Sequence, residues 1–322
     1  MKQVGPVGGT SRDDGVAIVA RGLLLVLAAP SIAALVLDET SHAAKALRML
    51  ADVATVPSFF AVAGWLACTP VAAPRLAAVV RAGLPVALCG LAGAFVAAAL
   101  APLAGLDAQS GLARAAPVWG LALLPAIYAF VARALRASPV ALGAVAIAAH
   151  VLGVVLDKPA LIHFIFYLVG MTLAARRDLL AKLVADEPEF AFAGGPFVAV
   201  LAAAVAIRFS QTGQAPSIAA IGPIALALGL AAGPAMLASA MALGASPAGE
   251  ALARLGRVAP ALAVLWIPLF SALLAAASRG LAPSAPSALL MAIASLLLIA
   301  VLADIVLDAA ERAGFRRETA SF

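Results

Sequence analysis

Apolar residues in this chain fall into ten blocks of roughly 16 to 27 residues, separated by short polar segments. An α-helix rises about 1.5 Å per residue, so about 20 apolar residues cross the hydrocarbon core of a bilayer, which is about 30 Å thick. Continuous blocks of this length are typical of membrane helices, whereas the strands of a membrane barrel alternate in polarity. The pattern therefore predicts an all-α integral membrane protein, built as a bundle of about ten transmembrane helices. The predicted spans are residues 16–37, 50–68, 82–103, 117–132, 140–156, 160–175, 190–207, 217–243, 258–278 and 286–307.

The positions of lysine and arginine predict the orientation of this bundle. If the amino terminus lies inside, the inner segments carry 14 of the 21 basic residues, the outer loops carry 6, and Arg21 lies within the first span. Because cytoplasmic loops are enriched in basic residues, both termini are predicted to be cytoplasmic. The predicted organisation is a cytoplasmic amino-terminal segment at 1–15, a single transmembrane domain at 16–307 and a cytoplasmic tail at 308–322.

The longest polar stretch between spans, residues 176–189, is predicted to be a cytoplasmic link. Four apolar residues in it recur at helical spacing: Leu179, Leu180, Leu183 and Val184. Such spacing predicts a short amphipathic helix with these four side chains on one face.

Composition agrees with a membrane domain and removes several other classes. Hydrophobic residues make up 65% of the chain and charged residues only 11%, against roughly 25% charged in soluble domains. The net charge of +5 comes from basic residues in loops, so we expect membrane lipids and not nucleic acid as partners. Cys68 and Cys89 lie on separate predicted spans without the spacing of metal ligands, so no metal site is predicted. The first apolar block is too long for a cleavable signal peptide, so it is predicted to be retained as a span.

Arg21 stands within the first apolar block, where a charged group requires an explanation. One interpretation is that the side chain extends along the helix to the lipid headgroups. The other is that Arg21 faces the interior of the bundle and holds an anion. Position in the sequence leaves both interpretations open.

Two histidines and the carboxylate Asp304 also fall within predicted spans, and Asp52 stands at a span edge. For His150, near the middle of the fifth span, an interhelical hydrogen bond and a catalytic or proton-handling role are the alternatives. His163 stands beside Phe164, Phe166 and Tyr167 and is predicted to belong to an aromatic belt at the interface. Asp304 is predicted to take part in charge pairing at the end of the last helix.

Five segments, in order along residues 15 to 175, resemble the acyltransferase family 3 of bacterial membrane proteins. They are Ala20-Arg21-Gly22 with the leucine and valine run that follows, VPSFFAVAGW at 56–65, RLAAVVRAGLP at 75–85, PVWGLALLPAIYAF at 117–130 and HFIFYLVGMTLA at 163–174. The resemblance implies ten spans in a bacterial inner membrane and transfer of an acyl group from cytoplasmic acyl-CoA to a hydroxyl of an envelope glycan or lipid. It also implies acyl-CoA as a co-substrate, no permanently bound cofactor, and Arg21, Arg75 and Arg81 as residues that bind its phosphates.

The chain departs from the family pattern at positions that bear on activity. The family carries a histidine, regarded as the catalytic base, where this chain has Ile32, and an acid where it has Ile18. Ala63 replaces the serine of the second-span segment. Isoleucine can neither take a proton nor form a hydrogen bond, so the chain resembles a divergent member that is either active with a substitute base or catalytically lapsed. If it is active, His150 is predicted to be that base, as the only histidine that the sequence suggests is buried.

Two other classes of function stay open. Proline recurs within the predicted spans, as at Pro30, Pro125, Pro196 and Pro234, and such breaks accompany the central cavities of transporters. A small-molecule transporter or exporter is therefore an alternative. A third interpretation is an inactive homologue that acts as the partner subunit of an active enzyme.

Overall fold

The computed structural model confirms the predicted fold class at the level of helical membrane segments. It describes residues 12–34, 37, 41–67, 99, 124–125, 127–132, 139–156, 158–211, 218–259, 266, 270 and 284–312. Within these ranges the regular structure is helical and there is no strand.

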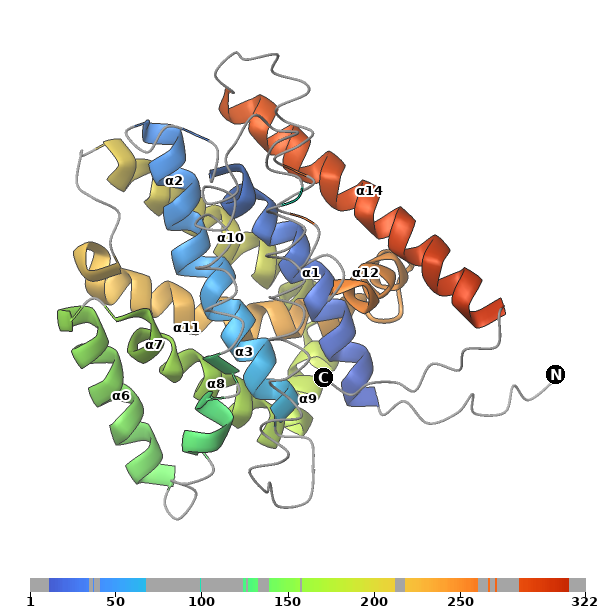
Figure 1. The fold of residues 1–322 in the computed structure, drawn as a ribbon. Coiled ribbons are helices and arrows are strands. Elements are labelled where there is room, and N and C mark those ends of the chain that lie inside the picture. Colours follow the sequence, from blue (N-terminus) through green and yellow to red (C-terminus); the bar gives the residue numbers. More distant parts are fainter. Residues whose placement is uncertain are drawn as a thin grey trace.

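The described helices follow one another along the chain and pack side by side in a bundle (Figure 1). They are α1 (Arg12–Ala34), α2 (His42–Leu50), the π-helix η1 (Ala51–Thr55), α3 (Val56–Ala67), α6 (Pro139–Leu156), α7 (Pro159–Ile162), α8 (Phe164–Ala175), α9 (Arg177–Asp186), α10 (Pro188–Gln211), α11 (Ile218–Leu243), α12 (Pro247–Arg257) and α14 (Ala285–Arg312).

Four helical stretches of the described part are long and apolar enough to cross a membrane. They are Gly15–Ala34, His42–Leu66, Pro188–Arg208 and Pro223–Leu243. The bent pair α8 and α9 would add a fifth, and α6 and α14 contain shorter apolar stretches. These helices overlap predicted spans. The predicted spans at 82–103 and 258–278 lie largely outside the described residues, and so does half of the span at 117–132. The count of ten spans and the cytoplasmic position of the termini stay predictions.

The second predicted span begins too late at residue 50. In the structure the helix begins at His42 and continues through η1 into α3. Its start is fixed by Ser41, whose side-chain oxygen accepts a hydrogen bond from the backbone N–H of Ala44 at 3.1 Å. Serine is a favoured residue at this position because it satisfies an N–H group that the first helical turn leaves unbonded. The basic residues Lys45 and Arg48 therefore lie on a helix and not in a loop.

The predicted inner loop after residue 243 is also a helix, α12. Ser246 caps it by accepting a hydrogen bond from the N–H of Gly249 at 3.0 Å, and Pro247 occupies the first helical position. Proline is common there because its missing N–H would have no partner in the helix. α12 packs along α1, which places a charged helix against the first apolar helix.

Glycine residues allow two pairs of helices to pack backbone against backbone. Between α3 and α8, a Cβ at Gly64 would meet the carbonyl of Tyr167, and a Cβ at Gly170 would meet the carbonyl of Ala61. Small residues permit such close approach in membranes, where helix association depends on packing and not on the hydrophobic effect. Between α1 and α12, Gly22 contacts the backbone of Leu252 in the same way.

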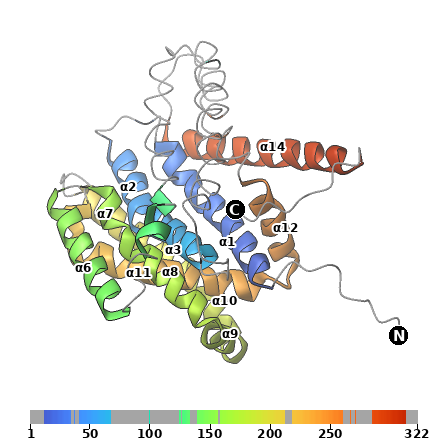
Figure 2. The ribbon, with the colours of Figure 1, turned by 60° about the horizontal axis from the view of Figure 1, so that its bottom comes forward.

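Large apolar side chains cover the outside of the bundle on α6, α10 and α14. On α14 they include Leu290 at 67% exposure, and on α10 Val200 at 68%. Such surfaces are unfavourable in water and fit the hydrocarbon of a bilayer. α6 and α14 lie at opposite edges of the bundle in both views (Figure 2).

The polar segment after α8 forms the helix α9, as its spacing predicts. α9 is bent by 76° from α8. The prediction of one shared apolar face is only partly right, because Leu180 is buried against the bundle whereas Leu179 and Leu183 are 61% and 44% exposed. Leu180 and Val184 pack inward, and the other two leucines point away from the bundle.

Candidate functional site

The helix that contains His163 is broken just before α8. The N–H of Phe166 donates to the carbonyl of His163 at 3.2 Å, three residues back, in place of the carbonyl of Ile162, four residues back. A break of this kind leaves backbone carbonyls without helical partners, and in a membrane each must be satisfied by a neighbouring group.

Two side chains from other segments satisfy these carbonyls. The hydroxyl of Tyr128 donates to the carbonyl of Ala160 at 2.6 Å, and Nδ1 of His150 donates to the carbonyl of Ile162 at 2.9 Å. A carbonyl can only accept, so Nδ1 of His150 carries the proton. In the neutral imidazole, Nε2 is then the basic nitrogen.

Aromatic rings surround the second histidine, His163. Its ring is stacked on Phe60 at a centroid distance of 5.1 Å and an interplanar angle of 15°. Phe166 lies 6.1 Å from the rings of both histidines. His163 is 3% exposed, and its Nδ1 has no hydrogen-bond partner among the residues that the structure describes.

These contacts bear on the two predictions for the histidines. The interhelical hydrogen bond of His150, one of the two alternatives, is present. The prediction that only His150 is buried is wrong, because His163 at 3% exposure is buried as deeply as His150 at 6%. His163 does not lie on an exposed aromatic belt, since Phe60 of α3 and Phe166 of α8 cover it.

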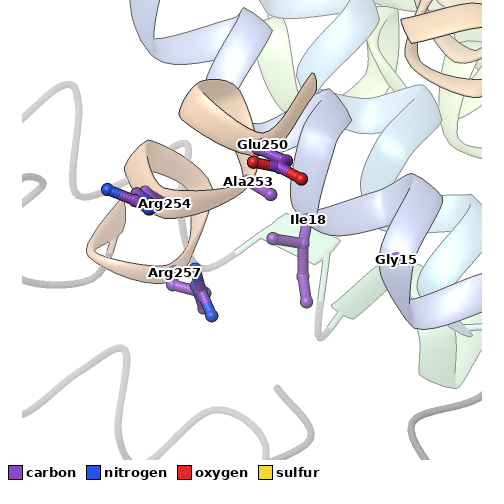
Figure 3. A pocket seen from close by; sticks show the side chains of 6 residues that line it. All are labelled: Gly15, Ile18, Glu250, Ala253, Arg254 and Arg257. Carbon is purple, nitrogen blue, oxygen red and sulfur yellow. The ribbon is translucent and has the colours of Figure 1, made fainter. Parts of the chain in front are cut away.

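A hollow of about 260 Å³ lies between the start of α1 and α12. Gly15 and Ile18 line it from α1, and Glu250, Arg254 and Arg257 from α12. Figure 3 shows Arg257 beside Ile18, whereas Arg254 extends outward from α12. Two arginines and one glutamate give this lining a formal charge of +1. Both arginines fall in a loop of the predicted topology, and the Ser-Pro start of α12 was the available signal for the helix that carries them.

The residues at the three departures from the expected pattern lie in different surroundings. Ile32 is buried in a cluster with Trp266, Phe270 and apolar residues of α14. Ile18 lines the hollow, and Ala63 packs against the aromatic cluster around Tyr128.

The predicted arginines are placed only in part. Arg21 is half-buried on α1, three residues beyond Ile18, and both interpretations of its role stay open. Arg75 and Arg81 lie outside the described residues, as do Cys68, Cys89 and the side chain of Asp304.

The structure does not bring Arg21 and His150 together. α1 packs on α12 and α14, whereas α6, which carries His150, packs on α7 and α8. α3 contributes to both sides, with Val62 and Trp65 in the cluster around α1 and Phe60 in the aromatic cluster. The hollow, lined by α1 and α12, and the histidines, on α6 and between α7 and α8, are therefore two separate sites. These two groups of helices lie on different sides of the bundle (Figure 1).

Replacing Tyr128 with phenylalanine tests the support of the helix break. The variant keeps the ring and removes the donor to the Ala160 carbonyl, so we expect the free energy of unfolding to fall by about 1 kcal/mol. Thermal unfolding in detergent measures it. Phe130→Leu, which changes an exposed ring nearby, is the control and should leave the midpoint unchanged. Equal midpoints for Tyr128→Phe and the wild type would contradict the role of the hydroxyl.

The long apolar helices and their exposed apolar surfaces define a helical integral membrane protein. Comparisons with protein-family models, with curated proteins and with solved structures found no match.

Proposed function

We propose that the chain is an inner-membrane O-acyltransferase of the kind that acyltransferase family 3 represents. It would take the acyl group of cytoplasmic acyl-CoA and pass it to a hydroxyl of an envelope glycan or lipid. The observation that carries the proposal is the hollow beside α1, which is lined by two arginines. The hollow lies at one end of the first span, and the distribution of basic residues predicts that this end is cytoplasmic.

The hollow suits the phosphate groups of acyl-CoA. Guanidinium groups bind phosphate oxygens through paired N–H donors. Arg254 and Arg257 each supply one guanidinium group to the lining of the hollow. Arg21, Arg75 and Arg81 are proposed to add to this binding. A long flexible arm joins the phosphates to the thioester, so the phosphate site and the base need not adjoin.

His150 is proposed as the base, because its protonated Nδ1 leaves Nε2 as the nitrogen that can take a proton. In the transfer step, the proton of the acceptor hydroxyl passes to Nε2 and the hydroxyl oxygen bonds to the thioester carbonyl carbon. The carbon–sulfur bond then breaks, and the CoA thiolate takes the proton from Nε2. The products are the ester and free CoA.

Binding of CoA tests the hollow directly. The double variant Arg254→Gln with Arg257→Gln is expected to weaken binding about thirtyfold, since each exposed arginine–phosphate contact contributes roughly 1 kcal/mol. Isothermal titration calorimetry of the purified protein in detergent measures the dissociation constant. Arg176→Gln with Arg177→Gln removes two basic residues from the segment around α9 and should leave binding unchanged. Equal losses in both double variants would show a nonspecific effect of net charge.

Transfer itself is tested with radiolabelled acetyl-CoA and membranes that contain the protein. Label in lipid or glycan, absent from membranes without the protein, would support the proposal. Binding of CoA without transfer would favour a lapsed enzyme that serves as a partner subunit. Neither binding nor transfer, together with solute flux in vesicles, would favour transport.

A further inference from the structure

We propose that Nδ1 of His163 binds a neutral hydroxyl group of a ligand. The first observation is the state of this nitrogen: it is buried, and the described residues give it no hydrogen-bond partner. A buried polar atom without a partner is unfavourable by about 1–3 kcal/mol, and in proteins such atoms are paired in most cases.

The second observation is that two polar side chains close to His163 already donate to other groups. Tyr128 donates to the Ala160 carbonyl and His150 to the Ile162 carbonyl, immediately before His163 in the chain. These two bonds hold α7 in place, so neither donor is directed to the ring of His163. The helix break therefore fixes the backbone before His163, and neither of these two donors occupies its Nδ1.

The surroundings of His163 indicate the chemistry of the ligand. Phe60 is stacked on the imidazole and Phe166 lies beside it, so a charged ligand would lose its hydration without compensation. A hydroxyl both donates and accepts, so it can satisfy Nδ1 in either tautomer. A neutral alcohol fits both requirements. The inference deepens the proposed function. It rests on that function in one respect, which is the identification of this hydroxyl with the acyl acceptor.

The experiment places the full-length protein in phosphatidylcholine nanodiscs with nitrogen-15 labelled histidine. Dioleoylglycerol, which has one free hydroxyl, is compared with the same lipid acetylated at that hydroxyl, and maltose is added separately as a soluble source of hydroxyl groups. The Nδ1 resonance of His163 is identified by its loss in His163→Phe. We expect the free hydroxyl, and not its acetylated form, to shift this resonance.

Variants separate binding from a structural role. His163→Phe keeps the stacking on Phe60, so it should fold with unchanged or higher thermal stability and bind dioleoylglycerol at least tenfold more weakly. His163→Asn keeps a hydrogen-bonding group and should retain part of the binding. His42→Gln, which changes the exposed histidine at the start of α2, should bind as the wild type does.

Each outcome bears on the proposal. A shift with dioleoylglycerol supports a lipid hydroxyl, and a shift with maltose alone supports a soluble glycan hydroxyl. An identical resonance under all conditions, as a bound water would produce, would overturn the proposal. Because binding is measured without turnover, an absence of acyl transfer would contradict the proposed function and leave this test intact.

Discussion

Replacing Gly170 with leucine is expected to prevent recovery of folded protein, or to lower its free energy of unfolding by about 3 kcal/mol or more. A Cβ at this position would overlap the backbone carbonyl of Ala61 on α3, and backbone cannot move aside as a flexible side chain can. The two helices would have to separate. The yield of monodisperse protein in detergent and its thermal unfolding midpoint measure the effect.

Gly143 on α6 supplies a matched control for this prediction. A Cβ built there has nothing within 4 Å, and the residue is exposed on the apolar outer surface. Gly143→Leu should therefore give a normal yield and an unfolding midpoint at or slightly above that of the wild type. Equal behaviour of the two leucine variants would show that α3 and α8 are not in backbone contact.

Replacing His150 with asparagine is expected to lower acyl transfer by about 10² to 10⁴, the usual effect of removing a general base. Asparagine can still donate a hydrogen bond toward the Ile162 carbonyl, as Nδ1 of the histidine does, but it cannot take a proton at neutral pH. The substitution therefore separates the base from the support of α7. Initial rates with radiolabelled acetyl-CoA, at equal amounts of folded protein, measure the loss.

Alanine at the same position is the comparison for this second prediction. His150→Ala removes both functions, so it should lose transfer to the same extent. Its free energy of unfolding should also fall by about 1–3 kcal/mol, which lowers the unfolding temperature. Transfer rates within twofold of the wild type for His150→Asn would exclude His150 as the base. His163, the other buried histidine, would then be the residue to test.

Sequence pattern predicted the apolar helices well because their length is set by the bilayer. α6, α10 and α11 begin and end within a few residues of the predicted spans. The error at α2 has a local cause. Its nine residues mix apolar side chains with the basic Lys45 and Arg48, and such a stretch resembles a loop unless Ser41 is recognised as a helix cap. α12 was missed for the same reason at Ser246.

The candidate sites were harder to predict because they depend on contacts between distant segments. The sequence marks His150 as a candidate but gives no sign that its partner is the carbonyl of Ile162. That carbonyl is available only because α7 ends at Ile162, and a break of one residue leaves no pattern in so apolar a stretch. The hollow likewise depends on α12 folding back along α1.

The interlocking of α3 and α8 has a consequence for how the molecule could move. Gly64 of α3 contacts the backbone of α8, and Gly170 of α8 contacts the backbone of α3. If one helix slid or rotated against the other, their backbones would collide. We therefore expect the two helices to move together as one rigid unit. Any relative motion within the bundle is then expected between this pair and helices at its edges, such as α6 and α14, so labels for distance measurement are best placed across those contacts.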